Sequence, residues 1–351
     1  MRYIGNKTRL LDFLRQTLRA RGIRGGTAYD PFTGTASVAR ELKRLGFRVV
    51  ASDVMEYAHV FGRAYVQAAA EPRFGALADE LGRDAATLKD VVAHLDGLQG
   101  EPDFVHEHFA CERRYFTPEN AARIDGIRGT LRRWRAHGRI TEDAFYLLLA
   151  ALLEAADRVA NTAGVYAAYI KTWQPNATRP LRLRTPRFLA SNGCRALRGD
   201  ALEVVAGASE PIDLLYIDPP YNTRQYPGYY HVPELIALGW FDEVPRLRGK
   251  TGLLDDADKR SDWARRGRCE AALDALVARA PCRSILLSYN SEGIIPESRI
   301  EQILCAYGRP TSYRVYRQTG YRRYRADADR PGRRYAGDRV EERVYCVDKP
   351  D

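Results

Sequence analysis

The fold is decided by the stretch Ile212-Asp213-Leu214-Leu215-Tyr216-Ile217-Asp218-Pro219-Pro220-Tyr221. The residues before Asp218 form a near-continuous apolar run, which is typical of a strand buried on both faces of a parallel sheet. Two successive prolines cannot continue a strand, so the chain must leave the sheet after Asp218 in a stiff, extended form. This arrangement places a carboxylate, a proline carbonyl and an aromatic ring at the carboxyl edge of the sheet.

Three further strand signals surround this stretch, at 27–30, 48–53 and 284–290. A helical pattern at 37–45 joins the first two, so strand, turn, helix and strand follow one another as at the start of a parallel α/β sheet. A first helix is expected at 7–20, where leucines recur every four residues. We therefore predict an α/β fold with a doubly wound, mostly parallel sheet.

The middle of the chain has a different pattern. Residues 57–190 show mostly helical spacing and little strand signal. Within them, 71–103 carries a net charge of −5 and 112–139 a net charge of +5, which fits either one basic face or alternating solvated helix faces. We predict a catalytic domain in two parts, 1–56 and 191–351, around an inserted helical subdomain.

The C-terminal part adds two features. The polar, glycine-containing stretch 249–268 is expected to be a mobile loop. The stretches 311–319 and 339–347 alternate as strands do and flank a basic connection, which predicts a hairpin with a long tip.

The composition favours a globular protein with a polyanionic partner. The 351 residues include 55 Lys+Arg against 45 Asp+Glu, a net charge of +10, and 45% are hydrophobic. No apolar run is long enough to span a bilayer and the N-terminus lacks the apolar core of a secretory signal, so we expect a cytoplasmic protein without membrane contact. Six scattered cysteines and the short cluster His106-Glu107-His108 do not provide a metal-ligand set, so we expect no metal.

A second motif lies between the first predicted strand and the helix that follows it. It is Asp30-Pro31-Phe32-Thr33-Gly34-Thr35, where the small Gly34 would let the backbone approach a ligand closely. Asp53 follows Asp30 by 23 residues and ends the next strand. That spacing fits a carboxylate that binds the hydroxyls of a ribose, although a purely structural turn would also explain it.

Together these motifs resemble those of the amino-methylating DNA methyltransferases, which bind S-adenosylmethionine on a doubly wound sheet. The opening Arg2-Tyr3-Ile4-Gly5-Asn6-Lys7 resembles the N-terminal motif of the D12 class, the adenine-specific subclass related to Dam, and the order of motifs is the same. The extension Asn222-Thr223-Arg224-Gln225-Tyr226, with Tyr230-His231, resembles the longer Asp-Pro-Pro-Tyr-Asn-x-Arg-Gln-Tyr motif of FokI-type methylases. The segments 161–166 and 288–290 are also similar to that group.

The resemblance implies a role for each motif residue. Asp218, Pro219, Pro220 and Tyr221 would be catalytic, with Asp218 and the Pro219 carbonyl accepting hydrogen bonds from the target amino group. The cofactor-binding residues would be Tyr3, Lys7, Asp30, Phe32, Gly34, Asp53, Asp200 and Asp218. Lys7 would equally suit a surface position in the first helical turn, and Asp200 a helix N-cap. The family often has a second glycine where this chain has Ala36, which would be strained if φ is positive there.

The DNA-binding residues expected from the sequence lie in three places. Asn222 and Arg224 belong to the catalytic motif's extension. Arg322, Arg323, Arg333 and Arg334 lie in 313–335, a stretch with net charge +6 and five tyrosines, and the inserted region offers Arg132, Arg133 and Arg135.

The implied reaction is methyl transfer from S-adenosylmethionine to N6 of adenine in double-stranded DNA after base flipping. The enzyme would act alone or beside a cognate restriction endonuclease. The alternatives are N4-methylation of cytosine, methylation of RNA or protein, and an inactive nucleic-acid-binding protein with the same fold. An intact Asp218–Tyr221 motif argues against the last of these.

Overall fold

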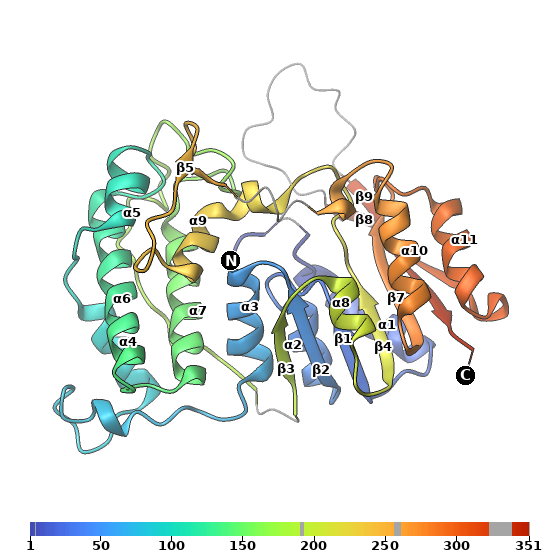
Figure 1. The fold of residues 1–351 in the computed structure, drawn as a ribbon, viewed down its shortest axis with the longest axis horizontal. Coiled ribbons are helices and arrows are strands. Elements are labelled where there is room, and N and C mark those ends of the chain that lie inside the picture. The colour runs from blue at the N-terminus through green and yellow to red at the C-terminus, as the bar shows by residue number, and fades with distance from the viewer. Residues whose placement is uncertain (4, 190–192, 256–260, 323–338, 351) are drawn as a thin grey trace.

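A seven-stranded sheet with helices on both faces forms the centre of the molecule (Figure 1). The computed structural model describes residues 1–3, 5–189, 193–255, 261–322 and 339–350. In chain order the strands of the sheet are β1 (Thr27–Asp30), β2 (Arg48–Asp53), β3 (Arg195–Arg198), β4 (Ile212–Ile217), β7 (Cys282–Asn290), β8 (Arg314–Arg322) and β9 (Arg339–Asp348).

The order of strands across the sheet is β3-β2-β1-β4-β7-β9-β8. The first five are parallel, and only β9 runs against its neighbours β7 and β8. The sheet grows outward in both directions from β1 and β4, so the predicted doubly wound, mostly parallel α/β fold is confirmed. The predicted hairpin is also confirmed as β8 and β9.

The helices form two layers because successive strand residues point to opposite faces of the sheet. Ala28 and Leu214 pack in one apolar core, and Tyr29 and Leu215 pack in the other. The helices of the first layer are α1 (Leu11–Ala20), α2 (Ser37–Arg44) and α3 (Glu56–Gly62). Those of the second are α8 (Ala201–Ala206), α10 (Cys269–Arg279) and α11 (Glu297–Tyr307).

A helical region extends the first layer beyond the sheet (Figure 1). It consists of α4 (Leu88–Gly97), α5 (Phe104–His106), α6 (Pro118–Ala136) and α7 (Glu142–Val159), with α9 (Tyr226–Leu238) beside it. Its apolar side chains belong to the same core as the first helical layer. Among the described residues, no helix combines the length and the apolar composition needed to cross a membrane.

The boundary of the inserted region at 57–190 stays a prediction. The helix that opens this range, α3, packs on the sheet itself, since a Cβ placed on Gly62 would lie 3.0 Å from the Cβ of Ala196 in β3. The chain after α3 and the short π-helix Arg63–Gln67 leads away from the sheet to α4. We propose that the subdomain begins there rather than at Tyr57.

Buried charges fix α9, which follows the catalytic motif in the chain. The carboxylate of Glu234 accepts hydrogen bonds from the backbone N–H groups of Glu56 and Tyr57, each at 3.1 Å, and so caps the N-terminus of α3. The guanidinium of Arg128 in α6 donates to the carbonyls of Ile236 (2.9 Å) and Ala237 (3.1 Å) at the end of α9. The catalytic motif is thereby attached to both the sheet and the helical region.

A small second hairpin overlaps the start of the predicted loop 249–268, and its first strand lies just before that loop. It is formed by β5 (Leu247–Arg248) and β6 (Leu253–Leu254), and Asp262–Ala264 forms a 3₁₀ turn. The predicted mobility concerns in part residues 256–260, which lie outside the described residues. Arg322 ends β8, and Arg323, Arg333 and Arg334 also lie outside them.

Candidate active site

The order of strands reverses between β1 and β4, and a cavity opens at their carboxyl ends. In open α/β sheets ligands bind at such a switch point. The cavity has a volume of about 950 Å³. Its lining includes every residue predicted for catalysis and for cofactor binding, namely Tyr3, Lys7, Asp30, Phe32, Gly34, Asp53, Asp200, Asp218, Pro219, Pro220 and Tyr221. Residues far apart in the sequence are thus brought to one site.

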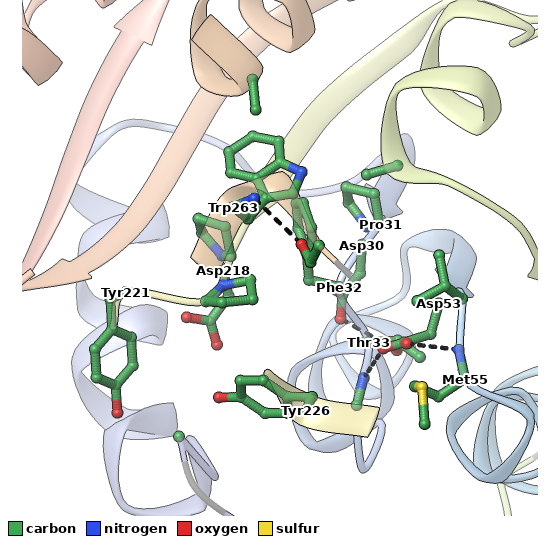
Figure 2. A pocket seen from close by; sticks show the side chains of 18 of the residues that line it. Asp30, Pro31, Phe32, Thr33, Asp53, Met55, Asp218, Tyr221, Tyr226 and Trp263 are labelled. Atoms are coloured by element: carbon green, nitrogen blue, oxygen red, sulfur yellow. Dashed lines mark hydrogen bonds between the residues drawn. The ribbon is translucent and has the colours of Figure 1, made fainter. Parts of the chain in front are cut away.

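Asp218 stands at the centre of this cavity, immediately after β4. Figure 2 shows its carboxylate directed toward the space between Tyr221 and Tyr226. The Nζ atom of Lys7 lies 3.2 Å from Asp218 Oδ1 and 3.3 Å from Oε2 of Glu342 in β9. Lys7 is therefore not at the surface, and only 4% of it is exposed.

The charges of this cluster follow from its burial. Burial raises the pKa of Asp218 to about 6; the ammonium of Lys7 opposes this rise and the carboxylate of Glu342 adds to it. Burial alone would lower the pKa of Lys7, but the carboxylates of Asp218 and Glu342 raise it well above its ordinary value. Near neutral pH the site therefore holds a buried cation beside an ionised Asp218.

The turn after β1 brings backbone close to an aromatic ring. Gly34 has φ +49°, and a Cβ there would lie 2.9 Å from the ring of Tyr3. Ala36 has φ 58° and ψ 22°, which is the left-handed conformation, and it directly precedes α2. The position that is often glycine in the family does require a positive φ here, and alanine adopts it.

Two further carboxylates line the same wall (Figure 2). Asp53 accepts hydrogen bonds from the backbone N–H groups of Gly34 and Met55, both at 3.0 Å. Burial raises its pKa to about 6, although these hydrogen bonds act in the other direction. Burial raises the pKa of Asp30 to about 8, and the negative charge of Asp218 adds to this rise. The Oδ1 atom of Asp30 is buried and has no hydrogen-bond partner among the described residues.

Aromatic rings form the remaining walls. Phe32 meets Trp263 edge to face with ring centroids 4.9 Å apart, and Tyr3 stacks on Tyr230 at 4.7 Å. Trp263 comes from the stretch predicted to be a mobile loop, yet it is only 7% exposed. Sequence reasoning missed it, although a lone tryptophan within a polar stretch was an available signal.

Glu342 is the other residue that the sequence reasoning missed. It lies on β9, which is separated from Lys7 by most of the chain. Its signal was subtle: it occupies an inward position between Val340 and Val344, where the strand pattern calls for an apolar side chain.

Asp200 is the N-cap of α8, while its contact with the cofactor stays a prediction. Its side chain accepts a hydrogen bond from the backbone N–H of Leu202 at 2.8 Å and caps α8, and it also lines the cavity. The N-terminal motif is fixed in a comparable way by Arg2. Its guanidinium donates to the carbonyls of Asp157 (2.9 Å) and Ala160 (3.1 Å) at the end of α7.

The predicted DNA-binding residues are spread over several elements. Asn222 accepts a hydrogen bond from the backbone N–H of Arg224 at 3.0 Å, and the Arg224 guanidinium lies 5.7 Å from the ring centre of Tyr229. The three arginines of the insert each face an acid: Arg132 with Asp242 (3.0 Å), Arg133 with Glu101 (3.7 Å) and Arg135 with Glu142 (2.7 Å).

One cluster in the helical region has the side chains of a metal site. Ligand atoms of Glu107, His108 and Glu112 all lie within 4.8 Å of one another. His108 Nδ1 is 3.0 Å from Glu112, and both glutamates are exposed, so the cluster is a surface contact between polar side chains.

Comparison with known proteins agrees with this geometry. Residues 3–293 match the family described as D12 class N6 adenine-specific DNA methyltransferase. The chain is 35% identical over 340 residues to the type II methyltransferase M.FokI of Planomicrobium okeanokoites, covering 93% of this chain and 50% of that protein. It is 34% identical over 337 residues to M.NlaIII of Neisseria lactamica, covering 93% of each. With M.CviAII of Paramecium bursaria Chlorella virus 1 it shares 28% identity over 319 residues, covering 88% of each. The chain thus spans about half the length of M.FokI but nearly all of M.NlaIII.

Proposed function

The chain belongs to the D12 class of N6 adenine-specific DNA methyltransferases, and we propose that it transfers a methyl group from S-adenosylmethionine to N6 of adenine at specific sites in double-stranded DNA. The observation that carries this proposal is the position of Asp218, Pro219, Pro220 and Tyr221. They lie at the carboxyl end of β4, in the cavity that Asp30 and Asp53 also line.

The residues present fit S-adenosylmethionine. Asp53 and Asp218 line the cavity, and Lys7, the buried cation among its lining residues, is already shared by Asp218 and Glu342. The site therefore favours a guest with positive charge. Gly34 lines the cavity without a side chain, and its missing Cβ lets the backbone pack against the ring of Tyr3. We assign Asp53 to the ribose hydroxyls, the region of Asp200 to the cofactor's adenine, and Tyr3 with the turn 30–35 to the methionine end.

The chain's own residues would prepare the target nitrogen. The sulfonium supplies an electrophilic methyl group when the cofactor is bound. Adenine N6 is a poor nucleophile because its lone pair is conjugated with the ring, so the site must favour a tetrahedral nitrogen. Asp218 and the Pro219 carbonyl accept the two N–H groups, and these preorganised acceptors stabilise the positive charge that develops on nitrogen. Tyr221 stacks on the flipped base.

Two hairpins, β5–β6 and β8–β9, are the candidate DNA contacts. In the β5–β6 hairpin, Arg246, Arg248 and Lys250 are exposed. In Figure 1 this hairpin lies on the same side of the molecule as the carboxyl ends of the parallel strands. β8 runs in the direction of β7, so the strand ends at Arg322 on that same edge of the sheet. Phosphate contacts from both hairpins would hold a duplex across the cavity.

Methylation of a plasmid by the full chain tests the proposal. Labelled S-adenosylmethionine measures the transfer, and single-molecule sequencing identifies the modified base and its sequence context. We expect N6-methyladenine at one recognition sequence. Label on cytosine N4 alone, on RNA or protein alone, or on no acceptor would contradict the assignment.

Two variants separate chemistry from cofactor binding. Asp218→Ala should abolish transfer yet bind S-adenosylmethionine, because Lys7 keeps Glu342 as a partner and the buried cation stays paired. Asp53→Ala should weaken cofactor binding, measured by calorimetry. If the enzyme works beside a cognate restriction endonuclease, plasmid DNA that the wild type has methylated should resist cleavage by that endonuclease.

A further inference from the structure

A buried carboxylate from the far end of the chain shares the ammonium that faces the catalytic acid. Lys7 lies between Asp218 and Glu342 at nearly equal distances of 3.2 and 3.3 Å. The side chains of Lys7 and Glu342 are each 5% exposed, so neither contact is a surface ion pair. Glu342 lies outside residues 3–293, the part of the chain that matches the family.

The charge balance of this cluster is unusual for a buried site. One ammonium faces two carboxylates, which leaves one uncompensated negative charge in surroundings from which water is largely excluded. Removing a charge from water is costly, so a site serving stability alone would be expected to balance its charges or be apolar. The positions on either side of Glu342 on the same face of β9 are Val340 and Val344, and both are buried. An apolar residue would suit this place in the core.

We propose that Glu342 is a positioning residue for methyl transfer, which holds Lys7 in place and prevents it from neutralising Asp218 completely. An ammonium that is shared between two carboxylates stabilises each of them less than it would a single partner. Asp218 then keeps more negative charge for the amino group of the target base. This charge favours the step in which the S–CH₃ bond breaks, the N6–CH₃ bond forms and positive charge passes from sulfur to nitrogen. The inference rests on the proposed function.

The ionisation of Asp218 gives this arrangement a measurable signature. Glu342 raises the pKa of Asp218 and Lys7 lowers it. Removing the negative charge of Glu342 should therefore lower the pKa of Asp218, so that it stays ionised at more acidic pH. The other titratable groups that face Asp218 from neighbouring elements are Asp30, Tyr216 and Tyr226. The tyrosines have pKa values raised by burial and stay neutral below pH 8, and Asp30 titrates near pH 8, above the acid limb.

The test compares Glu342→Gln with the wild type in single-turnover methylation of plasmid DNA at saturating cofactor from pH 5 to pH 9. We expect the rate at pH 8 to fall by roughly tenfold. The part of the acid limb that Asp218 contributes should move to lower pH by roughly one unit, while the part contributed by Asp53, whose pKa burial also raises to about 6, should stay where it is. A purely structural defect would lower the rate at every pH and leave the limb where it is. Glu342→Asp, which keeps the charge, should retain the limb of the wild type.

Glu341→Gln is the matched control because it removes the same charge from the next residue of β9. Its side chain pairs instead with Arg343 (2.6 Å) and Arg317 (2.9 Å) on the other face of the strand. It should leave both the rate and the limb unchanged. Thermal melting of each variant at neutral pH verifies that it is folded.

A second measurement does not depend on methyl transfer. Carbon-13 NMR of aspartate-labelled protein without DNA follows the titration of Asp218, whose resonance is identified by its loss in Asp218→Asn. An unchanged Asp218 titration in folded Glu342→Gln would overturn the inference, whatever the substrate of the enzyme is. If the wild type transfers no methyl group but the titration of Asp218 still shifts between the wild type and Glu342→Gln, only the proposed function would be contradicted.

Discussion

Asp30 shows, at the scale of a single residue, how an acid-lined cavity reduces stability. Its pKa in the folded protein is raised to about 8, well above the ordinary value of 3.8. Between these two values the folded state binds a proton that the unfolded state has released. Folding stability therefore falls as pH rises through this window and stays reduced above pH 8.

Asp30→Asn should remove this loss. We expect the melting temperature of the variant to exceed that of the wild type increasingly from pH 5 to pH 9, with little difference at pH 4. The exposed Asp84→Asn serves as the control and should follow the wild type throughout. A gain in stability that is the same at every pH would show that the buried charge of Asp30 is not the cause.

The site residues that the sequence reveals are those with a local signal. Asp218 follows a buried strand and precedes two prolines, and Gly34 stands in a turn between strand and helix, so each is recognisable from its neighbours. Glu342 and Trp263 carry no such signal. Their roles depend on contacts with Lys7 and Phe32, which only the folded sheet brings near them. No spacing rule connects positions so far apart.

At the scale of an element, the start of α2 depends on one residue in an unfavourable conformation. Ala36 is fully buried at φ 58°. The left-handed conformation costs an L-residue about 1–2 kcal/mol relative to glycine, while a buried methyl group contributes roughly 0.8 kcal/mol. Glycine would relieve the strain and lose the methyl contact. We expect Ala36→Gly to change the free energy of unfolding by less than about 1 kcal/mol.

Valine at this position should behave very differently. A β-branched side chain both resists a positive φ and overfills a buried site. Ala39→Val provides the control because Ala39 is also fully buried but lies within α2. Urea unfolding should show Ala36→Val to be less stable than Ala39→Val by about 1–2 kcal/mol, the strain of the backbone. Equal losses would mean that overfilling alone accounts for both.

Elements with strong periodicity could be predicted, and short ones could not. The predicted strand at 48–53 coincides with β2, and the predicted helix at 37–45 ends one residue beyond α2. By contrast, β5 and β6 have two residues each, which is too few to show alternation. β3 lies at the border of the sheet, where exposed arginines are tolerated at both of its ends. Its apolar signal is therefore weak.

At the scale of the whole molecule, the two oppositely charged segments of the helical region turn out to pair with each other. Arg123 lies 3.5 Å from Asp96, Arg139 lies 3.2 Å from Glu80, and Arg133 faces Glu101. Much of the predicted basic face of 112–139 is therefore compensated within the subdomain. The sequence shows the charge of each segment, but only the folded structure shows that the two segments meet. Positive charge available for DNA has to be sought elsewhere on this side of the cavity.

We expect the positive charge that contacts DNA to lie on the β5–β6 hairpin. The hairpin is attached through Thr251, whose carbonyl accepts a hydrogen bond from the hydroxyl of Tyr115 at 3.2 Å. Replacing its basic side chains should therefore not detach it.

The triple variant Arg246→Ala, Arg248→Ala, Lys250→Ala should weaken DNA binding and reduce the slope of log K against log salt by roughly 2–3. In the hairpin Arg248 faces Asp255 at 3.0 Å, whereas all three side chains of Arg132→Ala, Arg133→Ala, Arg135→Ala face acids, so this second variant removes the same number of charges but should have a smaller effect. Fluorescence anisotropy with a labelled duplex at several salt concentrations measures both, while the affinity for S-adenosylmethionine should stay constant. A larger loss in the second variant than in the first would place the DNA on the helical face of the insert instead of the hairpin.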